Sequence, residues 1–110
     1  MTHYYDDEDL AKFGSIGDNV PELAEKFFEW YGAVMGEGAL TKREKALIAL
    51  GVAHAVQCPY CIEAYTENSL EAGADLDQMT EAVHVASAIR GGASLVHGMQ
   101  MRGHHDELSM

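Results

Sequence analysis

The chain has 110 residues, which is enough for one domain and too few for two. Its 18 acidic and 7 basic residues give a formal net charge of −11, which repels nucleic-acid phosphates and anionic lipid headgroups, so neither is expected as a partner. Hydrophobic residues make up 47% of the chain and charged residues only 23%, a balance typical of a folded protein rather than a disordered one. We therefore expect a single folded domain over residues 1–110.

The N-terminus shows no feature of an export or import signal. It lacks the cationic head and apolar segment of a secretory signal, and it is too acidic for a mitochondrial transit peptide. The most apolar stretch, residues 46–56, is about half the length needed to cross a bilayer. These features predict a cytoplasmic protein with no membrane partner. Residues 1–19 contain an acidic run and a turn-rich segment, so they are expected to form an arm.

Four segments have the apolar periodicity or the end signals of helices. A 3.6-residue rhythm follows Pro21 and predicts a helix over residues 21–35, ended by the glycines at 36 and 38. Thr41 and Glu44 have the spacing of a capping box, which predicts a second helix over residues 42–57. Pro59 breaks that helix and is tolerated in the first turn of a third, which should extend to about residue 72.

The last predicted helix begins near Asp75 or Asp77, and the tail at about residues 103–110 is expected to fray because it has no periodicity. No strand-like alternation of useful length occurs, so the predicted fold class is all-α. The apolar residues at helical spacing in the last helix are expected to face inward: Met79, Val83, Ala86, Ile89, Ala93 and Val96.

The only two cysteines, Cys58 and Cys61, are three positions apart at the predicted start of the third helix. Unpaired N–H groups and the helix dipole stabilise a thiolate there, and the thiolate is the nucleophile. Two thiols at this spacing can also form a disulfide, so one can attack an oxidant and the other can resolve the product. The pair therefore predicts redox chemistry.

Two other interpretations of the cysteines stay open. They could be small buried hydrophobic residues. They could also supply half of a zinc site, with His54, His84 or His97 completing it, although the chain has no second pair at a regular ligand spacing. We expect neither a bound metal nor a cofactor.

The stretch from Leu40 to Tyr65, with a glutamate ahead of Cys58-Pro-Tyr-Cys61, resembles the carboxymuconolactone decarboxylase and alkylhydroperoxidase-D-like family. The likeness continues through residues 72–74 and 81–98. It implies an all-helical protomer assembled into trimers or hexamers. It also implies a peroxidase cycle in which the second cysteine attacks the peroxide, the first resolves it, and a glutamate and a histidine relay protons. Residues 53–65 also look like a subgroup of peroxidase-like proteins associated with arsenosugar biosynthesis.

Carried over residue by residue, the resemblance makes Cys61 the attacking thiol, Cys58 the resolving thiol and Glu44 the relay acid. The family's histidine position is occupied by Tyr65, a phenol that donates hydrogen bonds but is a poor base near neutral pH. His54, four residues before Cys58, is the candidate replacement base because its ordinary pKa is close to neutral pH. Glu44, His54 and Tyr65 are therefore predicted to form the polar shell of the thiols.

Two of these shell residues also have a purely structural interpretation. His54 lies in an apolar run and could be a core histidine bonded to a backbone carbonyl. Glu44 could act only as the acid of the capping box, if its side chain turns toward Thr41.

The leading hypothesis is a thiol-dependent peroxidase-like or disulfide-exchange protein. Its expected partners are a small-molecule oxidant or thiol substrate, a reducing partner that recycles the disulfide, and further copies of the chain in a helical homo-oligomer. One alternative is a non-redox decarboxylase-type enzyme on the same scaffold. Another is a non-enzymatic module that binds a soft metal or trivalent arsenic through its thiols.

Overall fold

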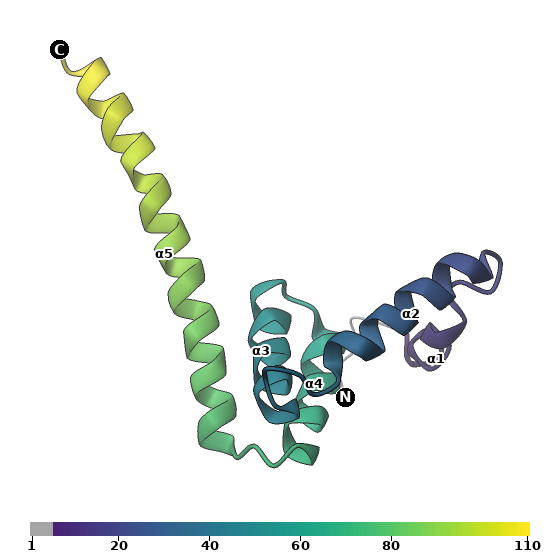
Figure 1. Cartoon of the computed structure of the whole chain (residues 1–110). Helices are drawn as coiled ribbons and strands as arrows, with labels where there is room; N and C mark the ends of the chain where they lie inside the picture. The colour runs from purple at the N-terminus through teal and green to yellow at the C-terminus, as the bar shows by residue number, and fades with distance from the viewer. Residues whose placement is uncertain (1–5) are drawn as a thin grey trace.

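The computed structural model describes residues 6–110, and these residues contain helices and no β-strand. The predicted all-α class is confirmed, and no helix in the described range is long and apolar enough to span a bilayer. Figure 1 shows the elements in chain order: α1 (Asp7–Ala11), the short 3-10 helix η1 (Phe13–Ser15), α2 (Pro21–Met35), α3 (Lys42–Ala55), α4 (Pro59–Glu71) and α5 (Leu76–Leu108).

Local signals set the starts of the helices. Thr41 caps α3 in a complete capping box with Glu44, and Asp75 caps α5 in the same way with Gln78. Prolines occupy the first turns of α2 and α4, where the missing N–H costs no hydrogen bond. The predicted bounds of α2 are confirmed, and those of α3 and α4 differ from the structure by one or two residues.

The core lies where α3 packs against α4 and against the first half of α5. Leu50, Ala74 and Met79 are buried there, and Leu47 and Tyr65 pack against them half-buried. A glycine sets the closest approach of α3 and α5, because a Cβ on Gly51 would lie 3.3 Å from the carbonyl oxygen of Ala82. This small core fixes the α3–α4 junction, where both cysteines lie.

The N-terminal elements attach to this core through both α3 and α4. The Lys45 side chain on α3 donates hydrogen bonds to the carbonyl oxygens of Val34 and Gly36, each 2.6 Å long, and so holds the C-terminal end of α2. Within the predicted arm, the Phe13 ring lies 6.0 Å from the Phe28 ring and 5.7 Å from the Tyr60 ring. The arm is therefore partly helical and reaches the turn that carries the cysteines.

Helix α5 departs from the prediction in two ways. It continues to Leu108, so the expectation that residues 103–110 fray is wrong: an existing helix extends without a new nucleation cost, and the tail holds no proline. Ile89 and Val96 were expected to face a core, yet they are 70% and 71% exposed. Val96 lies beyond the end of α3, since the 33 residues of α5 run about 50 Å and the 14 of α3 only about 21 Å. Ile89 lines an open apolar groove between α3 and α5.

The single chain is consequently not compact. Its radius of gyration is 18.8 Å, whereas a compact domain of this size has about 13 Å. The second half of α5 projects away from the other helices (Figure 1). A large apolar surface on this helix is therefore left uncovered by the described chain.

Candidate active site

The site begins at the junction of α3 and α4, which is built by a helix-ending motif. Gln57 adopts a left-handed conformation with φ of 58°, and its N–H donates to the carbonyl of His54 at 3.2 Å. The next N–H, that of Cys58, donates to the carbonyl of Ala53 at 3.0 Å. These two bonds form a Schellman motif, which ends α3 and places Cys58 directly beyond it.

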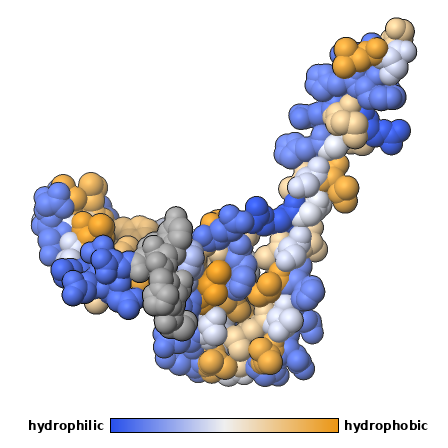
Figure 2. Space-filling model, turned by 180° about the vertical axis from the view of Figure 1, so that it is seen from behind, coloured by the Kyte–Doolittle hydropathy of each residue, from blue (hydrophilic) through white to orange (hydrophobic). Residues whose placement is uncertain are grey.

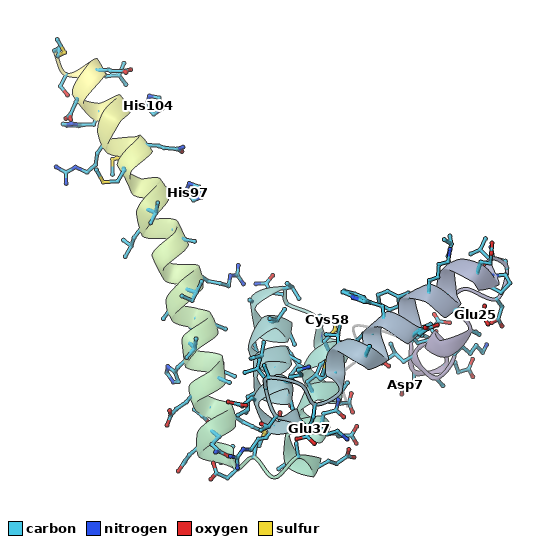
Figure 3. All side chains as sticks on the ribbon, viewed as in Figure 1. Asp7, Glu25, Glu37, Cys58, His97 and His104 are labelled. Carbon is cyan, nitrogen blue, oxygen red and sulfur yellow. A yellow bond between two sulfur atoms is a disulfide. The ribbon has the colours of Figure 1, made fainter. Side chains whose placement is uncertain are left out.

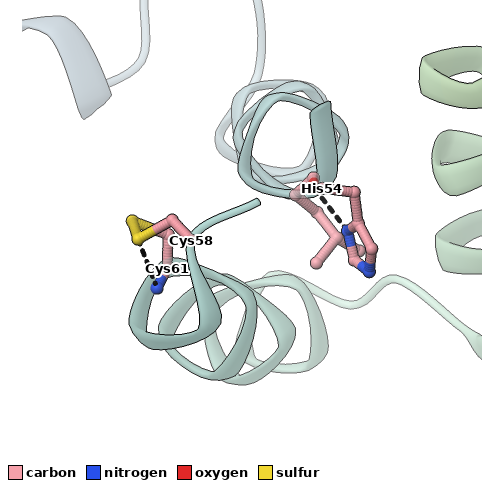
Figure 4. Close-up of a disulfide and its surroundings, with 4 residues drawn as sticks. His54, Cys58 and Cys61 are labelled. Atoms are coloured by element: carbon pink, nitrogen blue, oxygen red, sulfur yellow. Dashed lines mark hydrogen bonds between the residues drawn. A yellow bond between two sulfur atoms is a disulfide. The ribbon is translucent and has the colours of Figure 1, made fainter. Parts of the chain in front are cut away.

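Cys58 also starts the next helix. It is the N-cap residue of α4, and its Sγ accepts a hydrogen bond of 3.2 Å from the N–H of Cys61. The two residues are joined as a disulfide, with Cα atoms 5.2 Å apart (Figure 4). The predicted position of the pair at a helix start is confirmed. After reduction, the same N–H would favour a thiolate at Cys58.

Cys61 borders an open apolar groove with a volume of about 610 Å³. Tyr65, four residues later on α4, borders the same groove, so the phenol and the second cysteine lie on one helical face. Cys58 does not line it. We call this space the thiol groove; its lining includes Tyr31 and Val34 of α2, Ile48, Val52 and Val56 of α3, and Cys61 and Tyr65 of α4.

Helix α2 contributes the Tyr31 phenol to the lining of the thiol groove. Partial burial raises the pKa of the Tyr31 phenol above its ordinary value, and the neighbouring Tyr60 phenol raises it further. Tyr31 is therefore a neutral hydrogen-bond donor across the physiological pH range. Tyr31 thus offers an uncharged hydroxyl to a bound molecule, and Lys45 adds a cation to the lining of the groove.

His54 lies on α3 on the side away from the disulfide. Its Nδ1 is 2.9 Å from the carbonyl oxygen of Leu50, so Nδ1 carries the proton in that bond and Nε2 is the free nitrogen of the neutral ring. In Figure 4 the imidazole and the Cys58–Cys61 disulfide lie on opposite sides of the view. This carbonyl bond is the structural alternative that the sequence left open for His54.

Glu44 lies at the opposite end of α3 from the cysteines. Its carboxylate accepts from the N–H of Thr41 at 2.8 Å, and its own N–H donates to the Thr41 hydroxyl at 3.1 Å. The bonds from Thr41 lower the pKa of Glu44 below its ordinary value. Since α3 rises 1.5 Å per residue, about 17 Å of helix separates Glu44 from the end of α3 that leads to Cys58. The structure thus brings Cys58, Cys61 and Tyr65 together and leaves Glu44 and His54 apart from them.

Two histidines of α5 do not extend this site. His97 and His104 lie on the projecting half of α5, away from Cys58 (Figure 3). Within residues 6–110, no three histidine, cysteine or carboxylate side chains gather as metal ligands would.

Comparison with known proteins identifies the fold and the family together. The sequence description of the carboxymuconolactone decarboxylase family matches residues 21–101, which cover α2, α3, α4 and most of α5. The chain belongs to the carboxymuconolactone decarboxylase family. The resemblance seen around Cys58 and Cys61 is therefore confirmed at the level of the family.

Two relatives show how far the likeness of this carboxymuconolactone decarboxylase family member extends. It is 43% identical over 98 residues to uncharacterized protein 4 in the cox locus of Paracoccus denitrificans, covering 89% of this chain and 88% of that protein. It also superposes on the crystal structure of a Methanobacterium thermoautotrophicum protein with a TM-score of 0.73 and 38% identity, covering 76% of this chain and 94% of the other. The likeness covers nearly the whole length of each relative, in sequence for the first and in fold for the second.

Sequence reasoning missed the thiol groove and the left-handed Gln57. The groove is assembled from three helices, so no local pattern reports it. Gln57 carries a weak signal, because the residue between an apolar helix and a Cys-Pro pair must end the helix, but glycine or asparagine is the usual choice for that conformation.

Proposed function

We propose that this protein is a thiol-dependent oxidoreductase of the peroxidase-like or disulfide-exchange type. The observation that carries the proposal is the Cys58–Cys61 pair at the start of α4, which is close enough to form a disulfide. Of these two cysteines, Cys61 lines the thiol groove and Cys58 does not. Membership of the carboxymuconolactone decarboxylase family supports it.

The oxidative half of the cycle uses Cys61 as the nucleophile. Its thiolate attacks one oxygen of a peroxide, so an S–O bond forms, the O–O bond breaks, and the alcohol or water leaves with a proton. The Cys58 thiolate then attacks the Sγ of the resulting sulfenic acid and displaces its hydroxyl as water. The two cysteines have then given two electrons to the peroxide and become the disulfide.

The reductive half requires a dithiol reductant. We expect its thiolate to attack Cys61, because that residue faces the groove and because the N–H of Cys61 stabilises Cys58 as the departing thiolate. The second thiol of the reductant then displaces Cys61 and leaves as a disulfide. A cytoplasmic location fits this cycle, since the cytosol keeps dithiols reduced.

Tyr65 is proposed as the hydrogen-bond donor to the leaving oxygen, because its phenol shares the groove with Cys61. His54 and Glu44 keep their predicted catalytic roles only as hypotheses, and neither is needed for the steps above. The chain is further proposed to work as a homo-oligomer, because its free α5 surface is too apolar for a lone protomer.

The test is a reaction of the fully reduced protein with hydrogen peroxide and with an organic hydroperoxide, followed by mass spectrometry. We expect the wild type to form the Cys58–Cys61 disulfide, Cys58→Ser to accumulate a sulfenic acid on Cys61, and Cys61→Ser to react at least tenfold more slowly. Two thiols that stay unmodified in the wild type would refute the proposal. Decarboxylation of a small acid by the double Cys→Ser variant would favour the non-redox alternative.

A further inference from the structure

The surface that the described chain leaves uncovered is one continuous face of α5. The first half of this face forms, together with α3, an apolar groove of about 490 Å³. Figure 2 shows hydrophobic residues gathered over the body of the molecule and recurring along the projecting half of α5. Leu95, Val96 and Met99 on that half are 80%, 71% and 64% exposed.

The face has the repeat of a coiled coil. Seven residues of α5 follow one another at alternating spacings of three and four, which is the pattern of the two core positions in a heptad. We call them the α5 seam: Ala82, Val85, Ile89, Gly92, Val96, Met99 and Gly103. The first three line the groove with α3, and the last four continue along the projecting half.

The glycines of the projecting half point to a close neighbour outside the chain. Apart from its own stretch of helix backbone, a Cβ placed on Gly92 or Gly103 would meet nothing within 4 Å, so no contact among residues 6–110 explains these glycines. Each glycine in a helix interior costs about 1 kcal/mol relative to alanine. A second helix that packs closely over the seam would make use of the missing side chains.

We propose that the α5 seam pairs antiparallel with the seam of a second copy, about a twofold axis between Arg90 and Gly91. The projecting half of each helix then lies in the α3–α5 groove of the other copy. A parallel pair would instead bring the two grooves together and leave both empty. The inference rests on the homo-oligomer included in the proposed function.

The antiparallel register matches a large side chain with a small one in two of its three kinds of layer and two valines in the third. In an antiparallel coiled coil, each a position of one helix faces a d position of the other. Ala82 then faces Met99 of the partner subunit, Val85 faces the partner's Val96, and Ile89 faces the partner's Gly92. The twofold axis repeats each layer, so six layers are filled without two bulky residues or two glycines meeting.

Charge supports the same register. Glu81 and Arg102 flank the seam at equivalent heptad positions near its two ends. In the antiparallel pair, where g positions face g positions, each Glu81 lies beside Arg102 of the partner subunit, twice per dimer.

The pairing also completes the candidate active site. Ile48 and Val52 of α3 line both the α3–α5 groove and the thiol groove, and they are 53% and 54% exposed in the single chain. A partner helix seated in the α3–α5 groove covers the outer side of Ile48 and Val52. These two residues, which form part of the thiol groove, are then buried only in the assembled protein.

The test measures mass by analytical ultracentrifugation of the full chain. We expect an even number of copies for the wild type and half of that mass for Val96→Glu, because the added carboxylate would be buried in the seam. Ser94→Glu is the matched control, since it adds the same charge on the opposite face of α5, and it should keep the wild-type mass. A wild-type monomer or trimer, or a Val96→Glu protein of wild-type mass, overturns the pairing.

Charge reversal tests the orientation. We expect Glu81→Arg and Arg102→Glu each to raise the dissociation constant of the pair several-fold, and the double variant to return it toward the wild-type value. A double variant weaker than either single one overturns the antiparallel register. These masses do not depend on thiol chemistry, so unreactive cysteines with an intact pairing would refute the proposed function alone.

Discussion

Ser69 on α4 is fully buried, and its hydroxyl has no hydrogen-bond partner within the described residues. A buried hydroxyl without a partner costs roughly 1–3 kcal/mol relative to its hydration in the unfolded chain. Replacing it with alanine removes that penalty and adds about 0.5 kcal/mol of helix propensity. We therefore expect Ser69→Ala to stabilise the protein, although most substitutions at buried positions destabilise.

The magnitude follows from the opposing terms. The space left by one oxygen atom costs a few tenths of a kcal/mol at about 24 cal/mol per Å³ of cavity. The net gain should be about 1–3 kcal/mol, which corresponds to a rise in melting temperature of roughly 4–13 °C for a chain of this length.

The assay is thermal unfolding followed by circular dichroism at one fixed protein concentration, because an oligomer's melting temperature depends on concentration. Ser87→Ala is the matched control: Ser87 is exposed and its hydroxyl donates to the Val83 carbonyl at 3.0 Å. That variant should stay within about 0.5 kcal/mol of the wild type. A Ser69→Ala protein that melts below the wild type would show that the Ser69 hydroxyl has a native partner, and the reasoning would fail.

Three further predictions concern α3. Gly51→Val should destabilise by about 2–3 kcal/mol in urea unfolding, because its side chain would push α3 away from the carbonyl of Ala82; an unchanged midpoint would contradict the close approach. Glu44 has a lowered pKa, so its stabilising contribution is complete above its ordinary value of 4.5 and is lost as the pH falls below that value. The difference in melting temperature between wild type and Glu44→Gln should therefore shrink below pH 4.5, and a constant difference would exclude this linkage. His54→Gln should leave the pH profile of thiol alkylation unchanged, since the ring bonds to Leu50, whereas a profile that the substitution alters would restore His54 as the base.

The parts of the fold that were predictable from sequence depend on neighbours along the chain. The capping box at Thr41 and the proline after Cys58 determine where α3 and α4 begin, and both signals act within a few residues. Local signals alone therefore predict correctly that the two cysteines lie at the start of α4.

The missed parts depend on distance in space. The 3.6-residue rhythm of α5 shows which side of the helix is apolar but not what covers it. The sequence therefore predicts that Ile89 and Val96 are buried, whereas Ile89 lines an open groove and Val96 lies beyond the end of α3. Likewise, the position of His54 four residues before Cys58 would place the two on one face of a continuous helix, but the left-handed Gln57 turns the chain between them. The site could be located from sequence, but its polar shell could not.

The hydrogen bond from the N–H of Cys61 to the sulfur of Cys58 also bears on the electrochemistry of the pair. The bond is stronger to a thiolate than to a disulfide sulfur, so it stabilises the reduced protein more than the oxidised one. A preference of about 1.5 kcal/mol for the reduced form raises the two-electron reduction potential by on the order of 30 mV. The backbone of α4 therefore makes this disulfide a better electron acceptor, which the cell can return to dithiol with a weaker reductant.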